Sequence, residues 1–465
     1  MRVTMLAAAS LLAACHSLDP RPDRAAVADE VAVRTEAPAT NVPAGLDAAI
    51  SDEVTTLLRA PLSDAAAVRI LLLNNHTVRA RLEQLGVGRA DLVQAGLLRN
   101  PVFDLDARFL DAGTELEFGL AQPFLDLFFR PLRQRLAEHE FAAAQAMVTD
   151  ELVHLVFAVR RALVDVRATA QLTAVQRDAL RTAEAGHELM AALHAAGNAT
   201  DQALAIERVG ETRARLDLAA AELAAHEARE PVQRLLGLWG EHTEWTVAGE
   251  LADDPLGGVD LAAVESRVVA RSLELTAHRA RIDALAVQAD LDDRLAWTPD
   301  GELGVSAVRE PGGEYGFGPR FALELPLLDG GSARRVAARA RLAAGMHDHA
   351  QLAVELRSAA RVLRDRAGLL AERVRFLREQ HLPARVTVVT TTLQTYNAMQ
   401  IGVFDVLQQQ RLQLADRREL VQSLRAAHQA RIDLQELLAG SLPESALRPF
   451  TLPSSSPTEA TRGGH

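Results

Sequence analysis

Two short stretches of the chain alternate apolar and polar residues, which is the pattern of a β-strand with two different faces. In residues 103–109 (FDLDARF), the phenylalanines, leucine and alanine fall on one face and the aspartates and arginine on the other. A turn at 111–113 and a second alternating run at 115–120 complete a predicted hairpin. The same three parts return in the second half of the chain, at 303–307, 311–313 and 315–325. One face of each hairpin suits hydrocarbon and the other suits water.

A very long helical segment follows each hairpin. Residues 135–196 contain no strong helix breaker, and at 1.5 Å per residue this segment would reach roughly 90 Å. Its counterpart covers 332–397, where Pro383 predicts a kink or a break. Both segments reverse at glycine-containing turns into return helices, predicted at 201–237 and 403–439. In the second return helix, leucine and valine recur every seven residues, a spacing typical of coiled coils.

The two halves resemble each other in sequence as well as in pattern. The motif RARLE at 79–83 is echoed by RARID at 279–283, and PFLD at 123–126 by PLLD at 326–329. A nearly constant offset indicates an internal duplication. The predicted repeats, each followed by its strand hairpin, are 44–250 with 102–123 and 251–446 with 302–327.

Composition supports long helices and argues against several classes of protein. Of the 465 residues, 48% are hydrophobic but only 4% are aromatic, a mixture typical of long helices rather than of a mixed core. The formal net charge of −12 and the absence of a basic stripe with aromatics argue against nucleic-acid binding. No uninterrupted apolar run of about 18 residues is present, so we expect any membrane crossing to use strands.

The single cysteine, Cys15, follows a short apolar run. The sequence Leu-Ala-Ala-Cys at 12–15 resembles the cleavage box of a bacterial lipoprotein signal, so we expect residues 1–14 to be removed and Cys15 to carry lipid, palmitate included. His16 stands where an aspartate would retain the protein at the inner membrane, which favours the outer membrane. The alternative is a short hydrophobic N-terminus with an incidental buried cysteine. One cysteine excludes an internal disulfide.

Two terminal segments have the composition of unstructured chain. Residues 15–43 are rich in proline, alanine, aspartate and arginine without a period, which predicts a lipidated tether. Residues 447–465, with their serine run, predict a disordered tail.

Four strands cannot close a barrel, and an open sheet edge cannot lie in lipid because its amides would lack partners. Several copies must therefore pool their hairpins, and three copies would supply twelve strands. Water-facing residues would line the pore, and their charges suggest a cation-tolerant channel. These residues are Asp104, Asp106, Glu115, Glu117, Arg320 and Glu324.

Four further motifs, in this order and spacing, resemble the TolC family of outer-membrane efflux proteins, in its lipid-anchored branch. They are LLRNP at 97–101, LLGLWG at 235–240, LPLLDGG at 325–331 and YNAMQIG at 396–402. The resemblance implies a mainly α fold with a small transmembrane β part, in which antiparallel helices form a long barrel and a homotrimer shares a twelve-stranded β-barrel. It also implies a periplasmic adaptor and an inner-membrane pump, of RND type, as partners. Two motifs, GLWG and YNAMQIG, are most similar to members that handle heavy metals.

By the same resemblance, residues at the helical tips close the periplasmic end of the channel. The implied gate residues are Thr200, Asp201, Tyr396 and Asp405, with Asp201 bonding Tyr396 and Asp405 projecting into the constriction. The implied adaptor-docking turns contain Gly197, Asn198, Met399 and Gly402.

The tip sequence departs from the family pattern in two ways. Ile401 stands where a gating arginine is expected, and Gly197 lies two residues closer to Thr200 than in the family prototype. The alternative interpretation is that Asp201 and Asp405 are first-turn residues stabilised by the helix dipole.

No catalytic constellation emerges, so we predict no enzyme, no cofactor and no metal site. His347 and His349 flank Asp348, but residues two apart on a helix point in different directions.

Two other classes of protein stay open beside the channel. A lipid-anchored periplasmic adaptor should have one helical hairpin with lipoyl-like segments, and a structural coiled-coil lipoprotein should have unbroken heptads. The duplicated two-faced hairpins favour the channel, whereas its cargo (metal, drug or peptide) and its pump stay open.

Overall fold

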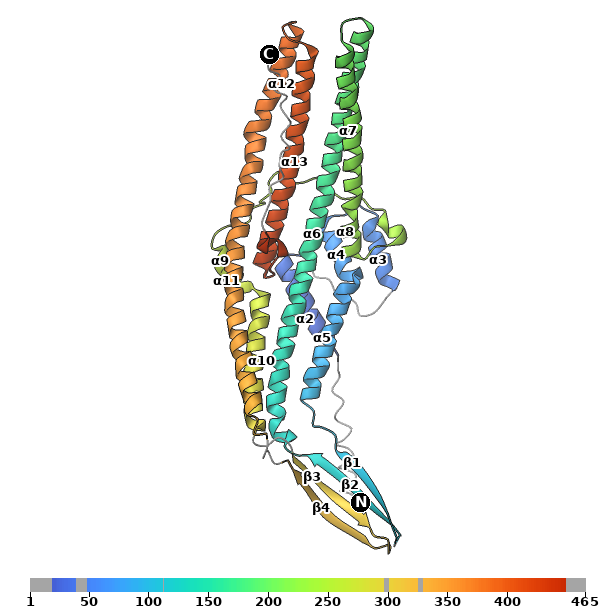
Figure 1. The fold of residues 1–465 in the computed structure, drawn as a ribbon, viewed down its shortest axis with the longest axis vertical. Helices are drawn as coiled ribbons and strands as arrows, with labels where there is room; N and C mark the ends of the chain where they lie inside the picture. Colours follow the sequence, from blue (N-terminus) through green and yellow to red (C-terminus); the bar gives the residue numbers. More distant parts are fainter. Residues whose placement is uncertain (1–18, 39–47, 112, 297–300, 325–328, 449–465) are drawn as a thin grey trace. The chain divides into compact units, whose positions relative to one another are not determined.

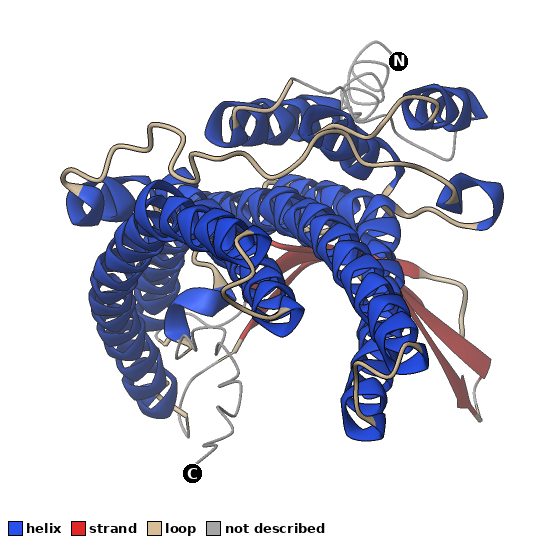
Figure 2. Ribbon diagram, turned by 90° about the horizontal axis from the view of Figure 1, so that it is seen from above, coloured by secondary structure: helices blue, strands red, loops and turns tan. Residues whose placement is uncertain are grey.

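The computed structural model describes residues 19–38, 48–111, 113–296, 301–324 and 329–448. The chain divides into two compact units. The first combines residues 1–27, 80–150 and 273–355, and the second combines 28–79, 151–272 and 356–465. Helices (blue in Figure 2) predominate, with a single sheet (red) among the described residues.

The sheet belongs to the first unit and has four antiparallel strands in the order β1-β2-β3-β4 (Figure 1). Asp106 pairs with Glu117, Phe118 with Ala307, and Val305 with Pro319. The strands are β1 Val102–Leu110, β2 Gly113–Pro123, β3 Gly301–Arg309 and β4 Tyr315–Leu323. The two predicted hairpins are therefore present, and they join through β2 and β3.

Each half of the first unit pairs a shorter helix with the beginning of a longer one. A Cβ built at Gly88 of α5 would lie 3.1 Å from the Phe141 ring of α6, and one built at Gly345 of α11 would lie 3.2 Å from Leu285 of α10. Glycine thus lets each helix pair approach closely. The helices are α5 His76–Ala95, α6 Asp126–Ala195, α10 Leu273–Leu295 and α11 Ser332–Phe376.

The second unit contains the remainder of α6 and α11 with the other helices. Its core includes Leu152, Phe157 and Leu163 of α6, and Leu434 and Leu437 of α13, all nearly inaccessible to solvent. The helices are α3 Ala48–Leu58, α4 Asp64–Asn74, α7 Asp201–Glu227, α8 Arg229–Leu236, α9 Val264–Arg271, α12 Leu382–Asn397 and α13 Val403–Ala439. Short 3-10 turns cover Gly240–Thr243 and Glu444–Leu447.

The long helices follow the prediction closely, with two differences. Helix α6 begins at Asp126, nine residues before the predicted start, and contains Pro131 near its beginning. The break expected near Pro383 is a five-residue π-helical turn, Leu377–His381, directly before α12. Proline lacks the backbone N–H that would continue the regular α-helical bonding, so the wider turn precedes it.

The tether prediction is wrong for part of its length, because Arg21–Thr35 forms helix α2. Val27 and Val31 are both fully buried, one turn apart on the helix. Within the second unit, Nη1 of Arg34 donates to the carbonyls of Arg271, at 2.8 Å, and Ala439, at 2.7 Å. The narrow buried stripe and the Arg34 side chain give the segment a fixed structure.

Cys15 and most of the predicted tail lie outside the described residues.

We expect Arg34→Met to lower the free energy of unfolding by about 2 kcal/mol, because the carbonyls of Arg271 and of the buried Ala439 would lose a charged donor. Chemical denaturation followed by circular dichroism measures this. Arg208→Met, at an exposed position of α7, is the matched control and should change stability by less than about 0.5 kcal/mol. Equal effects of the two substitutions would contradict the assigned role of Arg34.

Among the described helices, one is long and apolar enough to cross a membrane, the α6 segment Leu127–Ala195. Half of its most apolar window is buried in the structure. A packed core helix meets the same criterion, so this is weak support for a spanning helix.

Candidate functional site

The sheet has one polar and one apolar face. Residues directly opposite each other in an antiparallel ladder point to the same side, so the strand registers assign every side chain. The polar face contains Asp104, Asp106, Arg108, Glu115, Glu117, Glu302, Ser306 and Arg320. Five of the six predicted pore-lining residues thus share one face, and Glu324 is exposed directly after the end of β4.

The opposite face carries large apolar side chains that are exposed to solvent in the single chain. Phe109 is 84% exposed and Phe317 is 81% exposed. Other exposed members are Phe103, Leu105, Phe118, Leu120, Leu303, Val305 and Phe321. An exposed apolar surface of this kind is typical of a face that meets lipid or a partner.

Both arginines of the polar face are held by carboxylates. Arg108 lies 3.3 Å from Glu115, 3.4 Å from Asp106 and 3.7 Å from Glu117. Arg320 donates to both carboxylate oxygens of Asp104, at 2.7 and 2.8 Å. With Glu302 and Glu324 included, six carboxylates face two guanidinium groups, so negative charge remains in excess.

The first helical tip joins α6 to α7. Gly197 has a φ of 73°, a left-handed conformation that glycine adopts without strain. The hydroxyl of Thr200 caps α7 by accepting from the Ala203 amide at 3.1 Å. Oδ1 of Asp201 accepts from Nε2 of His194 at 2.6 Å, although the Asp201 side chain is 98% exposed.

The second tip joins α12 to α13 and repeats the backbone bonding of the first, with methionine in the place of Gly197. Here Met399 has the positive φ, 60°, and its side chain is 93% exposed. Gly402 is the residue before α13, and Asp405 lies exposed in the first turn of that helix. Left-handed methionine is uncommon, so neighbouring bonds must hold this turn. Two are present, from the Met399 amide to the Tyr396 carbonyl and from the Gln400 amide to the Thr395 carbonyl.

Within the described part of one chain, no hydrogen bond joins Asp201 to Tyr396. Asp201 bonds His194 instead, and Tyr396 is 38% exposed. The positions of Asp201 and Asp405 in first helical turns fit the helix-dipole interpretation. The latch between Asp201 and Tyr396 stays a prediction for the protein assembled from several copies.

If the latch operates, Asp201→Ala and Tyr396→Phe should each raise single-channel conductance, because each removes one partner of a closing bond. Planar-bilayer recording of the purified protein measures this. Ser423→Ala is a control because this position is buried in α13 away from both tips. Unchanged conductance in both latch variants would show that the latch hypothesis is wrong.

Buried ion pairs connect helices of the second unit, and sequence reasoning missed them. Glu207 of α7 is 2% exposed and pairs with Arg411 of α13. Glu436 of α13 is fully buried and binds His154 and Arg161 of α6. The partners lie 204 to 282 residues apart, so no local pattern indicated them.

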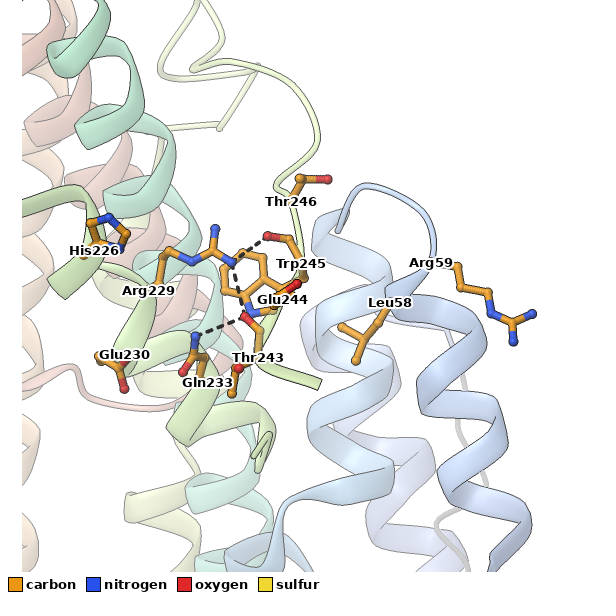
Figure 3. A pocket seen from close by; sticks show the side chains of 10 residues that line it. All are labelled: Leu58, Arg59, His226, Arg229, Glu230, Gln233, Thr243, Glu244, Trp245 and Thr246. Carbon is orange, nitrogen blue, oxygen red and sulfur yellow. Dashed lines mark hydrogen bonds between the residues drawn. The ribbon is translucent and has the colours of Figure 1, made fainter. Parts of the chain in front are cut away.

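The pocket in Figure 3 has a volume of about 590 Å³ and lies in the second unit. The guanidinium of Arg229 stacks on Trp245 at 4.3 Å and donates to the Trp245 carbonyl at 2.6 Å (Figure 3). The charge of Arg229 is therefore engaged in holding the loop after α8.

Among the described residues, no group of three or more histidine, cysteine, aspartate or glutamate side chains could hold a metal.

No family model and no curated protein sequence matches the chain. Solved structures of membrane proteins, channels among them, share its fold. The channel-forming CusC is 18% identical with a TM-score of 0.68, over 88% of this chain and 98% of that one. The outer membrane protein VceC of Vibrio cholerae is 17% identical with a TM-score of 0.63, over 85% and 97%. The Neisseria gonorrhoeae MtrE outer membrane channel, in its open state, is 18% identical with a TM-score of 0.65, over 81% and 88%. These similarities confirm the predicted mainly α fold with a four-stranded sheet in each chain.

Proposed function

We propose that the chain is the outer-membrane channel of a tripartite export system. Copies of the chain pool their four-stranded sheets into one β-barrel, and their helices form a duct on the periplasmic side. The channel is passive: an inner-membrane pump delivers substrate, and a periplasmic adaptor connects the pump to the duct. The solved channels that share the fold support this assignment.

The observation that carries the proposal is the two-faced sheet with two open outer edges. Large apolar side chains cover one face and charged side chains the other. Within the described residues, β1 and β4 each have a strand partner on one side only. A lipid-exposed sheet needs closure because every backbone amide in hydrocarbon needs a partner. A homotrimer gives twelve strands, an even number within the range of outer-membrane barrels.

Finer features of the proposal rest on the resemblance and on local chemistry. Cys15 carries the lipid that anchors the chain to the outer membrane, and the pump is of the RND type. The tips at Gly197–Asn198 and Met399–Gly402 meet the adaptor. The excess of carboxylates on the polar face favours passage of cations, and heavy-metal ions or drugs are the proposed cargo.

The first experiment is to extract the protein from separated outer membranes in mild detergent and to measure its mass by light scattering with correction for bound detergent. One chain has a mass of 50.2 kDa, so a particle of about three times this mass in the outer-membrane fraction supports the pooled barrel. A monomer, or recovery with the inner membrane alone, would contradict the proposal. An adaptor or a structural lipoprotein would then be the better assignment.

A further inference from the structure

We propose that Asp104 and Arg320 form the charged seam between neighbouring copies of this chain. In this assignment, Arg320 on β4 of one copy binds the carboxylate of Asp104 on β1 of the next. The inference rests on the proposed function, because it concerns the barrel that several copies form together. These two residues would then select which strand of the neighbouring copy pairs with β1.

Asp104 and Arg320 lie on the two outer strands of the sheet. In the single chain they form an ion pair at 2.7 Å, and their side chains are 38% and 40% exposed. Strands β2 and β3 lie between them. Adjacent strands are about 4.8 Å apart, so three spacings separate β1 from β4 by roughly 14 Å along a flat sheet. This contact therefore needs a strongly curved sheet and two outstretched side chains.

Glycine makes the long contact possible. Gly119 of β2 and Gly304 of β3 face the same side of the sheet as the ion pair. A Cβ at Gly119 would collide with the Asp104 carboxylate. The Asp104 side chain thus leans across β2 towards the far edge of its own sheet. Gly119 lies opposite Asp104 and Gly304 lies opposite Arg320, so the two glycines leave space on the diagonal between the charged groups.

In a closed ring the same two residues lie on adjacent strands of neighbouring copies. With four strands per copy in alternating directions, β4 of one copy runs antiparallel to β1 of the next and can pair with it directly. The two strands are then one spacing apart, about 4.8 Å. Asp104 and Arg320 both point to the polar face, so a change of side-chain rotamer at Asp104 moves its carboxylate from its own Arg320 to that of the neighbour.

The charges also fix which edges meet. One edge presents a carboxylate and the other presents a guanidinium, so each copy binds the next head to tail. A heterologous interface of this kind closes into a ring when the rotation per copy permits. Two β1 edges, or two β4 edges, would bring like charges together, which disfavours the wrong pairing.

The test uses the charge reversals Asp104→Arg and Arg320→Asp in full-length protein. Each variant alone places like charges at every seam, and we expect the yield of trimer to fall about tenfold. When the two variants are produced together with different tags, a mixed trimer has two seams with opposite charges and one with like charges. Random assembly from equal amounts would give three quarters mixed trimers, a ratio of three mixed to one pure. We therefore expect this ratio to rise severalfold.

The competing possibility is that the ion pair acts only within one chain. Each variant chain would then contain its own like-charged pair, and mixing would bring no enrichment. Gly119→Ala also distinguishes an ion pair within one chain from an ion pair between copies. The added methyl group blocks the path of the Asp104 side chain across β2, so the trimer yield should stay unchanged if the ion pair joins copies. Asp111→Arg, at the exposed hairpin turn, is the matched control for the added charge.

The oligomeric state of the unmodified protein distinguishes a failure of the seam assignment from a failure of the proposed function. If the unmodified protein is not an oligomer in the outer membrane, the proposed function fails and the seam fails with it. If the unmodified protein is a trimer, but the reversals assemble normally or mix in statistical proportion, only the seam assignment is overturned.

Discussion

In the proposed channel, the double variant Glu115→Gln/Glu117→Gln should lose about half of the preference for cations, because the excess of carboxylates over guanidinium groups on the polar face falls from four to two. The polar face of each chain carries six carboxylates and two guanidinium groups, and the substitutions remove two of the six. They also remove two of the three carboxylates near Arg108, which leaves its positive charge less neutralised. The zero-current potential across a planar bilayer, under a tenfold gradient of potassium chloride, measures the preference.

Salt concentration provides an internal check on this result. The Debye length is about 10 Å at 0.1 M salt and about 3 Å at 1 M, so the difference between the two proteins should shrink as salt is raised. Glu227→Gln/Glu241→Gln has the same change of net charge at two exposed positions in the second unit, and it should keep the original potential. Equal potentials for all three proteins would mean that the polar face does not line the conducting path.

Arg161→Met should destabilise the helical part of the protein by about 3–5 kcal/mol, the largest effect expected of any single substitution considered. Arg161 binds Glu436, which has no solvent exposure, and lies 3.1 Å from Asp433, which is 5% exposed. Removal of the guanidinium leaves two buried carboxylates without their shared cation. Burial already raises the pKa of Asp433, although the Ser445 hydroxyl and Arg161 oppose that rise.

Thermal or chemical unfolding, followed by helical circular dichroism, measures the effect of Arg161→Met. Arg181→Met is the matched control, because Arg181 is 75% exposed and pairs with Asp178 one turn away on the same helix. We expect it to cost less than about 0.5 kcal/mol. The double variant Arg161→Met/Glu436→Gln should recover part of the lost stability, since one buried charge is then gone. A similar cost for Arg161→Met and its control would refute the buried-cluster interpretation.

Local patterns were sufficient to predict the sheet and the long helices. Strand alternation and turn residues act over a few positions, so the hairpins around 111–113 and 311–313 could be predicted from neighbouring residues alone. The same alternation assigned the charged side chains to one face before any register was known. The helical tips could be located because a glycine or a helix start marks each one.

Features that depend on distant partners could not be predicted. Helix α2 buries only a narrow stripe that includes Val27 and Val31, and its stability depends on partners such as the carbonyl of Ala439, 405 residues from Arg34. Glu207 has the sequence context of an exposed helical glutamate, and only the position of Arg411 on another helix explains its burial. In both cases the deciding contact joins residues that no local window contains.

The composition of α6 has a consequence for how the protein is made. Its segment Leu127–Ala195 is long and apolar enough for a membrane span, yet half of its most apolar window packs inside the protein. Under the proposed function the chain is exported across the inner membrane, and it then passes the translocation machinery unfolded, when none of that packing exists. The helix must therefore be apolar enough to form a core and polar enough not to be released sideways into lipid. Buried polar residues such as Thr149 and Thr169 lower the apolar character of α6.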